Sequence, residues 1–120
     1  MSEPTRRIQT VLSTGLTSPG TFPAIAVPPG FRIVIVYFQC RAQLAAVGNI
    51  LVNMNFGGGP GDTDWTSPMG VANDWRMVEI NPGGGGIVGQ PAIGVGIIMT
   101  VLGSPGVVIK SLLNYYMEPA

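Results

Sequence analysis

The carboxylates that could do chemistry lie in one segment rich in glycine and proline, where Asp62, Asp64 and Asp74 occur. Loop carboxylates can bind calcium together with backbone carbonyls, but aspartate in such a segment more commonly supports turns and caps. A pair of carboxylates could also act on a glycosidic bond, yet no neighbouring residue would keep one of them protonated. We therefore expect no metal ion and no cofactor at these positions.

The chain contains no histidine and a single cysteine, Cys40. The lack of histidine removes the usual general base, the imidazole metal ligand and the serine–histidine–aspartate triad. Cys40 has no histidine to activate it and lies in an apolar stretch, so we interpret it as a core side chain. Gly84–Gly89 matches the pattern G-x-G-x-x-G, but Gln90 and Pro91 follow it instead of a helix, which favours a simple turn. We predict that the protein is not an enzyme.

Trp65 and Trp75 flank a polar segment that also carries Met69. Aromatic side chains in the loops of a β scaffold occur in sugar-binding modules and in protein interfaces, where they supply much of the binding energy. The alternative is that both tryptophans pack under the loop as a small second core. Arg6 and Arg7 could contact an acidic neighbour, or could be solvated. The candidate partner-binding residues are therefore Arg6, Arg7, Trp65, Met69 and Trp75.

The composition is poor in charge. Of the 120 residues, 46% are hydrophobic and only 10% are charged, with 18 glycines and 11 prolines. An average soluble domain carries about 25% charged residues. We therefore expect a homo-oligomer, a dimer or trimer, in which other chains cover much of the surface. Six basic residues balanced by six acidic ones predict no binding to nucleic acid.

Ile87–Ile109 has no charged residue and is long enough to cross a bilayer. Gln90, Pro91 and the turn at Gly103–Gly106 divide it into pieces of strand length, and no aromatic or basic flank marks its ends. The first seven residues lack the apolar core of a secretory signal. We expect neither a membrane span nor a signal peptide.

Phe31–Ala42 is dominated by β-branched and aromatic residues, which favour a strand. Alternate positions are apolar on both sides, which predicts a strand buried on both faces. Ile50–Phe56 alternates between apolar and polar residues, as expected for a strand with one face in the core. Gly48 and Asn49 lie between the two stretches, so we predict that they form an antiparallel hairpin.

Similar patterns predict further strands at Ile8–Thr14, Phe22–Val27, Trp75–Ile80, Ile93–Leu102 and Val107–Met117. Gly57–Asp74 is too rich in turn-forming residues for a regular element, and residues 1–7 form a polar arm. Seven or eight strands separated by turns, with no helix, predict an all-β protein: one antiparallel β-sandwich domain over residues 1–120.

A short histidine-free chain, the segment VPPGFRIVIVYFQCRA opening a sandwich, glycine-rich loops and few charges are found together here. This combination resembles the small jelly-roll cement or decoration proteins of tailed-phage heads, over residues 8–117 as a strand pattern. The resemblance implies a structural protein of the virion, made in the host cytoplasm, that binds the major capsid (coat) protein and stabilises the shell. Head fibres and tail components share the same features, and no residue role carries over.

Two other functions stay open on the residues alone. One is a carbohydrate-binding β-sandwich module that uses Trp65 and Trp75. The other is a small membrane-inserting protein built on Ile87–Ile109.

Overall fold

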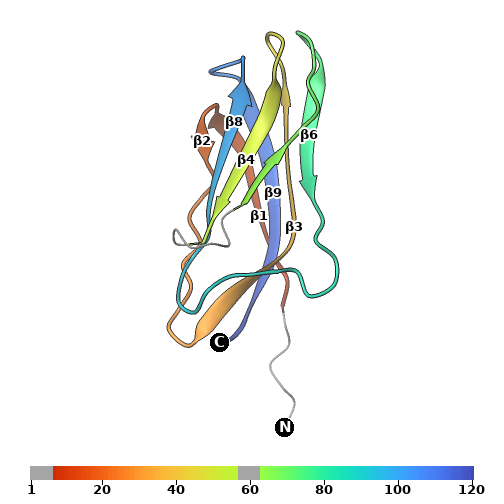
Figure 1. The fold of residues 1–120 in the computed structure, drawn as a ribbon. Helices are drawn as coiled ribbons and strands as arrows, with labels where there is room; N and C mark the ends of the chain where they lie inside the picture. Colours follow the sequence, from red (N-terminus) through yellow and green to blue (C-terminus); the bar gives the residue numbers. More distant parts are fainter. Residues whose placement is uncertain (1–6, 57–62) are drawn as a thin grey trace.

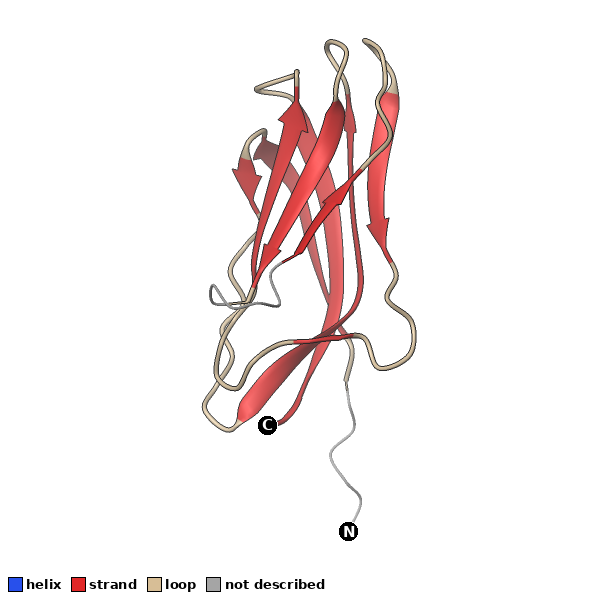
Figure 2. Ribbon diagram, viewed as in Figure 1, coloured by secondary structure: helices blue, strands red, loops and turns tan. Residues whose placement is uncertain are grey.

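Two antiparallel β-sheets pack face to face in the computed structural model, which describes residues 7–56 and 63–120 (Figure 1). No helix occurs in these residues (Figure 2). The strands are β1 Gln9–Thr17, β2 Gly20–Thr21, β3 Phe31–Gln43, β4 Asn49–Asn55, β5 Thr63–Thr66, β6 Trp75–Ile80, β7 Ile87–Val88, β8 Gly96–Leu102 and β9 Val108–Pro119.

The strand order is that of a jelly roll. The first sheet has the order β1-β9-β3-β6, with the short β7 also paired to β3, and the second sheet has the order β2-β8-β4-β5. Setting β7 aside, the pairs β1–β9, β2–β8, β3–β6 and β4–β5 are nested within one another along the chain. Such nesting arises when one long antiparallel hairpin is rolled into a double sheet. The predicted all-β, jelly-roll-like sandwich is therefore confirmed.

The uncharged stretch Ile87–Ile109 is divided among β7, β8 and the start of β9, with turns between them, as the sequence predicts. No helix among residues 7–56 and 63–120 is long and apolar enough to cross a membrane.

The central strand β3 changes the side that it turns to the core. Its register with β9 shifts between Ile35 and Tyr37, as at a β-bulge. Because one extra residue reverses the alternation, odd-numbered side chains face the core before the shift and even-numbered ones after it. The core-facing side chains are Ile33 and Ile35, then Phe38, Cys40 and Ala42.

Only the first half of β3 is covered on both faces. Val34 points away from the core cluster yet is fully buried, and a Cβ placed on Gly86 would lie 2.8 Å from its Cγ1. The turn before β7 therefore covers this part of the outer face. After the bulge Arg41 is exposed on the outer face. The predicted burial on both faces is wrong for the second half of the strand.

The predicted hairpin of β3 and β4 is also wrong. β3 belongs to the first sheet and β4 to the second, so residues 44–48 carry the chain across the sandwich. Leu44 is only 1% exposed and holds this crossing by packing into the core. The predicted alternation of β4 is nevertheless confirmed, since Ile50, Val52 and Met54 are fully buried.

Two further expectations need correction. Phe22–Val27 contains no strand: only the Phe22 N–H continues the pairing of β2, by donating to the Ile97 carbonyl at 2.8 Å, and Pro23 has no N–H to extend it. Within the predicted loop Gly57–Asp74, residues 63–66 form β5, which pairs with β4. Residues 1–6 of the predicted arm and residues 57–62 of that loop lie outside the described residues.

Candidate functional site

Three connections meet at one end of the sandwich, which we call the loop end (Figure 1). They are residues 44–48 between β3 and β4, 67–74 between β5 and β6, and 103–107 between β8 and β9. β1 begins and β9 finishes at the opposite end of a body that measures 55 × 26 × 24 Å. The loop end is therefore the end of the molecule away from both ends of the described chain.

Backbone hydrogen bonds join the first two connections directly. Gly48 and Gly70 exchange two N–H···O bonds of 3.0 and 2.8 Å. The Leu44 N–H donates to the Asp74 carbonyl, and the Asn73 N–H donates to the Leu44 carbonyl, both at 2.8 Å. A segment whose backbone groups are paired in this way resists local opening. Residues 67–74 are thus a fixed strap, not a loosely held loop.

Two buried serine hydroxyls hold the same region. The Ser104 Oγ accepts hydrogen bonds from the Ala45 and Ala46 N–H groups, both at 3.0 Å, and so ties the third connection to the first. The Ser67 Oγ accepts the Ile50 N–H at 2.9 Å at the start of the strap. These backbone N–H groups have no carbonyl partner on a neighbouring strand, and backbone donors removed from water need an acceptor. The serine hydroxyls supply that acceptor.

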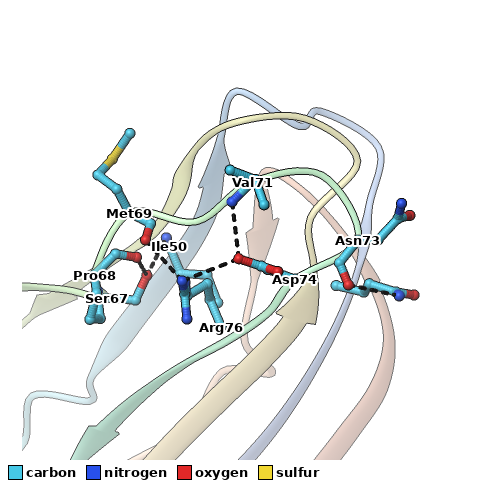
Figure 3. A network of polar contacts seen from close by, with 9 residues as sticks. Ile50, Ser67, Pro68, Met69, Val71, Asn73, Asp74 and Arg76 are labelled. Atoms are coloured by element: carbon cyan, nitrogen blue, oxygen red, sulfur yellow. Dashed lines mark hydrogen bonds and ion pairs between the residues drawn. The ribbon is translucent and has the colours of Figure 1, made fainter.

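Asp74 of the strap and Arg76 of β6 form an ion pair and hydrogen bonds that hold the middle of the strap (Figure 3). The Asp74 carboxylate accepts the Val71 N–H at 3.1 Å and pairs with Arg76 at 3.3 Å. The Arg76 guanidinium also donates to the Met69 carbonyl at 3.0 Å. Asp74 therefore supports a turn, which is the structural role that aspartate has in such segments.

The large side chains that the loop end presents fully to solvent are apolar, alongside the exposed Asn73 and the partly exposed Asp74. Met69 is 61% exposed and Val71 is 58% exposed on the strap, and Val47 is 63% exposed on the first connection. Trp75 and Leu102 are also exposed, at the strand ends beside these connections. Exposed apolar groups on a fixed backbone are typical of surfaces that bind another molecule.

The structure separates the two tryptophans that the sequence singled out. Trp65 pairs with Val52, whose side chain is fully buried, so Trp65 lies on the inward side of β5 and packs against the core. Trp75 lies on the outer face of the first sheet, at the start of β6. Because they point to different sides of different sheets, they do not form one stacking platform for a sugar.

The predicted arginines lie elsewhere. Arg7 is exposed and lies two residues before β1, which begins at the end of the sandwich opposite the loop end (Figure 1). It is therefore not brought together with Met69 and Trp75. Arg6 is outside the described residues.

Of the other carboxylates and the thiol that the sequence singled out, those in the described residues are hydrogen-bonded or buried. Asp64 accepts a hydrogen bond from the Asn53 amide at 2.6 Å, while Asp62 lies outside the described residues. Residues 7–56 and 63–120 contain no cluster of three or more side chains suited to hold a metal ion. Burial raises the pKa of the Cys40 thiol to about 12, so it stays protonated and is a poor nucleophile.

Sequence reasoning identified Met69 and Trp75 but missed Val47 and Val71. Each valine is a larger apolar residue with only alanine, glycine and asparagine close to it, in a segment that turns the chain. That placement is the signal that could have found them, since an apolar side chain in a turn gains little by local packing.

Comparison of the chain with protein-family models and with curated proteins gave no match. Among solved structures, the coat protein of Tobacco streak virus is similar, with a TM-score of 0.40 and 10% sequence identity. The similarity covers 100% of this chain and 91% of that one. No residue role and no partner follows from a likeness of this size.

Proposed function

We propose that this protein is a non-enzymatic structural protein of a virion, and that it binds over a coat-protein shell as a cement or decoration protein. The observation that carries the proposal is the fixed, apolar loop end on a chain that has few charges. The jelly-roll fold occurs in viral capsid proteins but also in lectins and cupins, so the fold is only an analogy here.

The loop end suits a protein partner on energetic grounds. Binding costs free energy for every segment that must be ordered, and here the backbone of 44–48 and 67–74 is already held by hydrogen bonds. The large exposed apolar groups are Met69, Val71 and Val47, with Trp75 beside them. Aromatic and other large apolar side chains that fill pockets in a partner supply most of an interface's energy. A lattice of coat subunits can offer such pockets at its seams.

The low charge supports an assembly with other chains. A surface with only 10% charged residues gains by being covered, whether by copies of the same chain or by the shell. We propose a dimer or trimer whose loop ends face the coat protein, with the major capsid protein of a tailed phage as the partner.

The test is binding to shells. Purified particles of the virus that carries this sequence should contain the chain when analysed by mass spectrometry. Purified protein should also sediment with empty coat-protein shells. Absence from the particles together with no sedimentation would show that the proposed function is wrong.

Variants locate the contact. Met69→Ser and Val71→Ser should leave the fold intact, because both side chains are mostly exposed. Each should weaken shell binding by about tenfold or more. Ile98→Ser is the matched control, since Ile98 is an exposed apolar side chain on the outer face of the second sheet, away from the loop end. Equal binding of all three variants would remove the loop end as the contact surface.

A further inference from the structure

Two basic residues face each other on the outer face of the first sheet, the side of β1, β9, β3 and β6 that is turned away from the core. Arg41 on β3 is paired in register with Lys110 on β9, and both side chains are exposed. Like charges directly opposite each other on neighbouring strands destabilise a sheet. The pair is therefore a local cost to the isolated protein.

The acids that lie on or beside the first sheet have other partners. Glu118 and Asp74 form ion pairs with Arg32 and Arg76. Glu79, which shares the outer face, accepts a hydrogen bond from the Tyr37 hydroxyl at 2.6 Å. That hydrogen bond raises the pKa of Tyr37, so the phenol stays protonated as the donor. Arg41 and Lys110 have no ion pair with any acid in residues 7–56 and 63–120.

Two shallow grooves flank Lys110. One, of about 230 Å³, runs between Leu12 on β1 and Arg41. The other, of about 210 Å³, lies between Lys110 and Trp75 and is also lined by Val108. Leu12 and Trp75 are 65% and 56% exposed, so apolar walls stand on either side of the two positive charges.

We propose that this outer face docks a protein partner through a carboxylate that lies between Arg41 and Lys110, with apolar side chains of the partner in the two grooves. The identity of the partner as the coat-protein shell rests on the proposed function. The chemistry of the site rests on the charge pair and the grooves alone. Trp75 borders both this face and the loop end, so one partner surface can contact both.

The surroundings favour a protein carboxylate over a phosphate backbone. Nucleic acids are bound through many cations that neutralise successive phosphates. Here two cations are bordered by Leu12, Val108 and Trp75, and an acidic side chain flanked by apolar ones matches that arrangement. A charged group buried against its counter-charge at an interface gives specificity as well as affinity.

The test uses the full chain and empty coat-protein shells in a sedimentation assay at several salt concentrations. Lys110→Gln and Arg41→Gln should each weaken binding by about tenfold or more and reduce its salt dependence. Lys110→Arg should bind as the unchanged protein does, because it keeps the charge. Thr21→Glu changes the net charge by the same amount on an exposed position of the second sheet, and should have no effect.

A second measurement separates a docking role from a structural one. The isolated Lys110→Gln protein should be at least as stable to denaturant as the unchanged chain, since the substitution removes a like-charge contact. Loss of stability would instead assign Lys110 to the fold and overturn the proposal.

Three other outcomes are decisive. If the unchanged chain binds shells and Lys110→Gln binds equally well, the docking face is wrong and the proposed function stands. If the unchanged chain binds no shells, both are wrong. Binding of single-stranded DNA that depends on Lys110 would assign the pair to a phosphate ligand and overturn the docking of a carboxylate.

Discussion

Replacing Ser104 by alanine tests whether a single hydroxyl holds the loop end together. The Ser104 Oγ is the acceptor for two backbone N–H groups, those of Ala45 and Ala46, each at 3.0 Å. Ser104 itself is 2% exposed, so water has little access to the position that the hydroxyl would vacate. Ser104→Ala should therefore leave two donors without an acceptor.

The expected cost follows from those two donors. A buried donor without an acceptor costs about 1–3 kcal/mol. Ala45 and Ala46 are exposed residues whose hydrogen bonds to Ser104 are only partly buried, and they share one acceptor, so we expect the lower end of that range for each. The total loss in the free energy of unfolding is then about 2 kcal/mol. It should appear as a lower midpoint of urea unfolding with an unchanged slope.

Ser111→Ala is the matched control. Ser111 is also buried, but its hydroxyl only donates one long hydrogen bond of 3.5 Å, to the Ser13 carbonyl. Its removal should cost less than about 1 kcal/mol, because a bond of that length contributes little. Amide hydrogen exchange should also become faster at Ala45 and Ala46 in Ser104→Ala. Equal losses in the two variants, or unchanged exchange at these amides, would refute the role assigned to Ser104.

Three further predictions concern the fold. Gly48→Ala should destabilise the protein by more than about 2 kcal/mol in urea unfolding, because an added Cβ would collide with the carbonyl oxygen of Leu102. A stability equal to that of the unchanged chain would show that Gly48 and the end of β8 are not in close contact. Cys40 should react with a thiol reagent only as fast as the protein unfolds, and rapid labelling of the folded chain would contradict its burial. The thiol pKa is raised from 9.0 to about 12, so the unfolded chain loses this proton first. The contribution of Cys40 to stability is thus present below pH 9 and is lost between pH 9 and 12, and Cys40→Ala should lack this part of the pH dependence.

Much of the strand content could be predicted from local pattern. β4 lies close to where the alternation of Ile50–Phe56 places it, and the alternating apolar positions Ile50, Val52 and Met54 are the buried ones. This works because a strand with one face in the core and one toward solvent carries the period of two in its own sequence. The all-β class followed in the same way, from many short apolar segments separated by glycine and proline.

Which sheet each strand joins could not be predicted locally. Gly48 and Asn49 are a sound turn signal, yet β3 and β4 lie in different sheets. These turn residues predict a change of chain direction, but they do not predict whether the next strand pairs with the previous one or joins the other sheet. Leu44, buried in the core, takes the chain across the sandwich, and that burial depends on residues far away in the sequence.

In the candidate site, too, some features could be predicted from local sequence and others depend on strand pairing. Met69 and Trp75 were identifiable because large apolar side chains in or beside a turn-rich segment are unusual. The inward position of Trp65 depends on the pairing of β5 with β4, and the opposition of Arg41 and Lys110 depends on the register of β3 with β9. Neither pairing is marked in the residues themselves.

β3 shows why the limit is physical. By itself the sequence determines a long apolar strand there, with both alternating sets of positions apolar. Only the tertiary structure decides that the first half turns Ile33 and Ile35 to the core and the second half turns Phe38 and Cys40, through the bulge between Ile35 and Tyr37. A strand that is covered on both faces and a strand that changes its core side leave the same apolar pattern. The pairing with β9 selects between them, because the register of two strands is set by contacts along both of them.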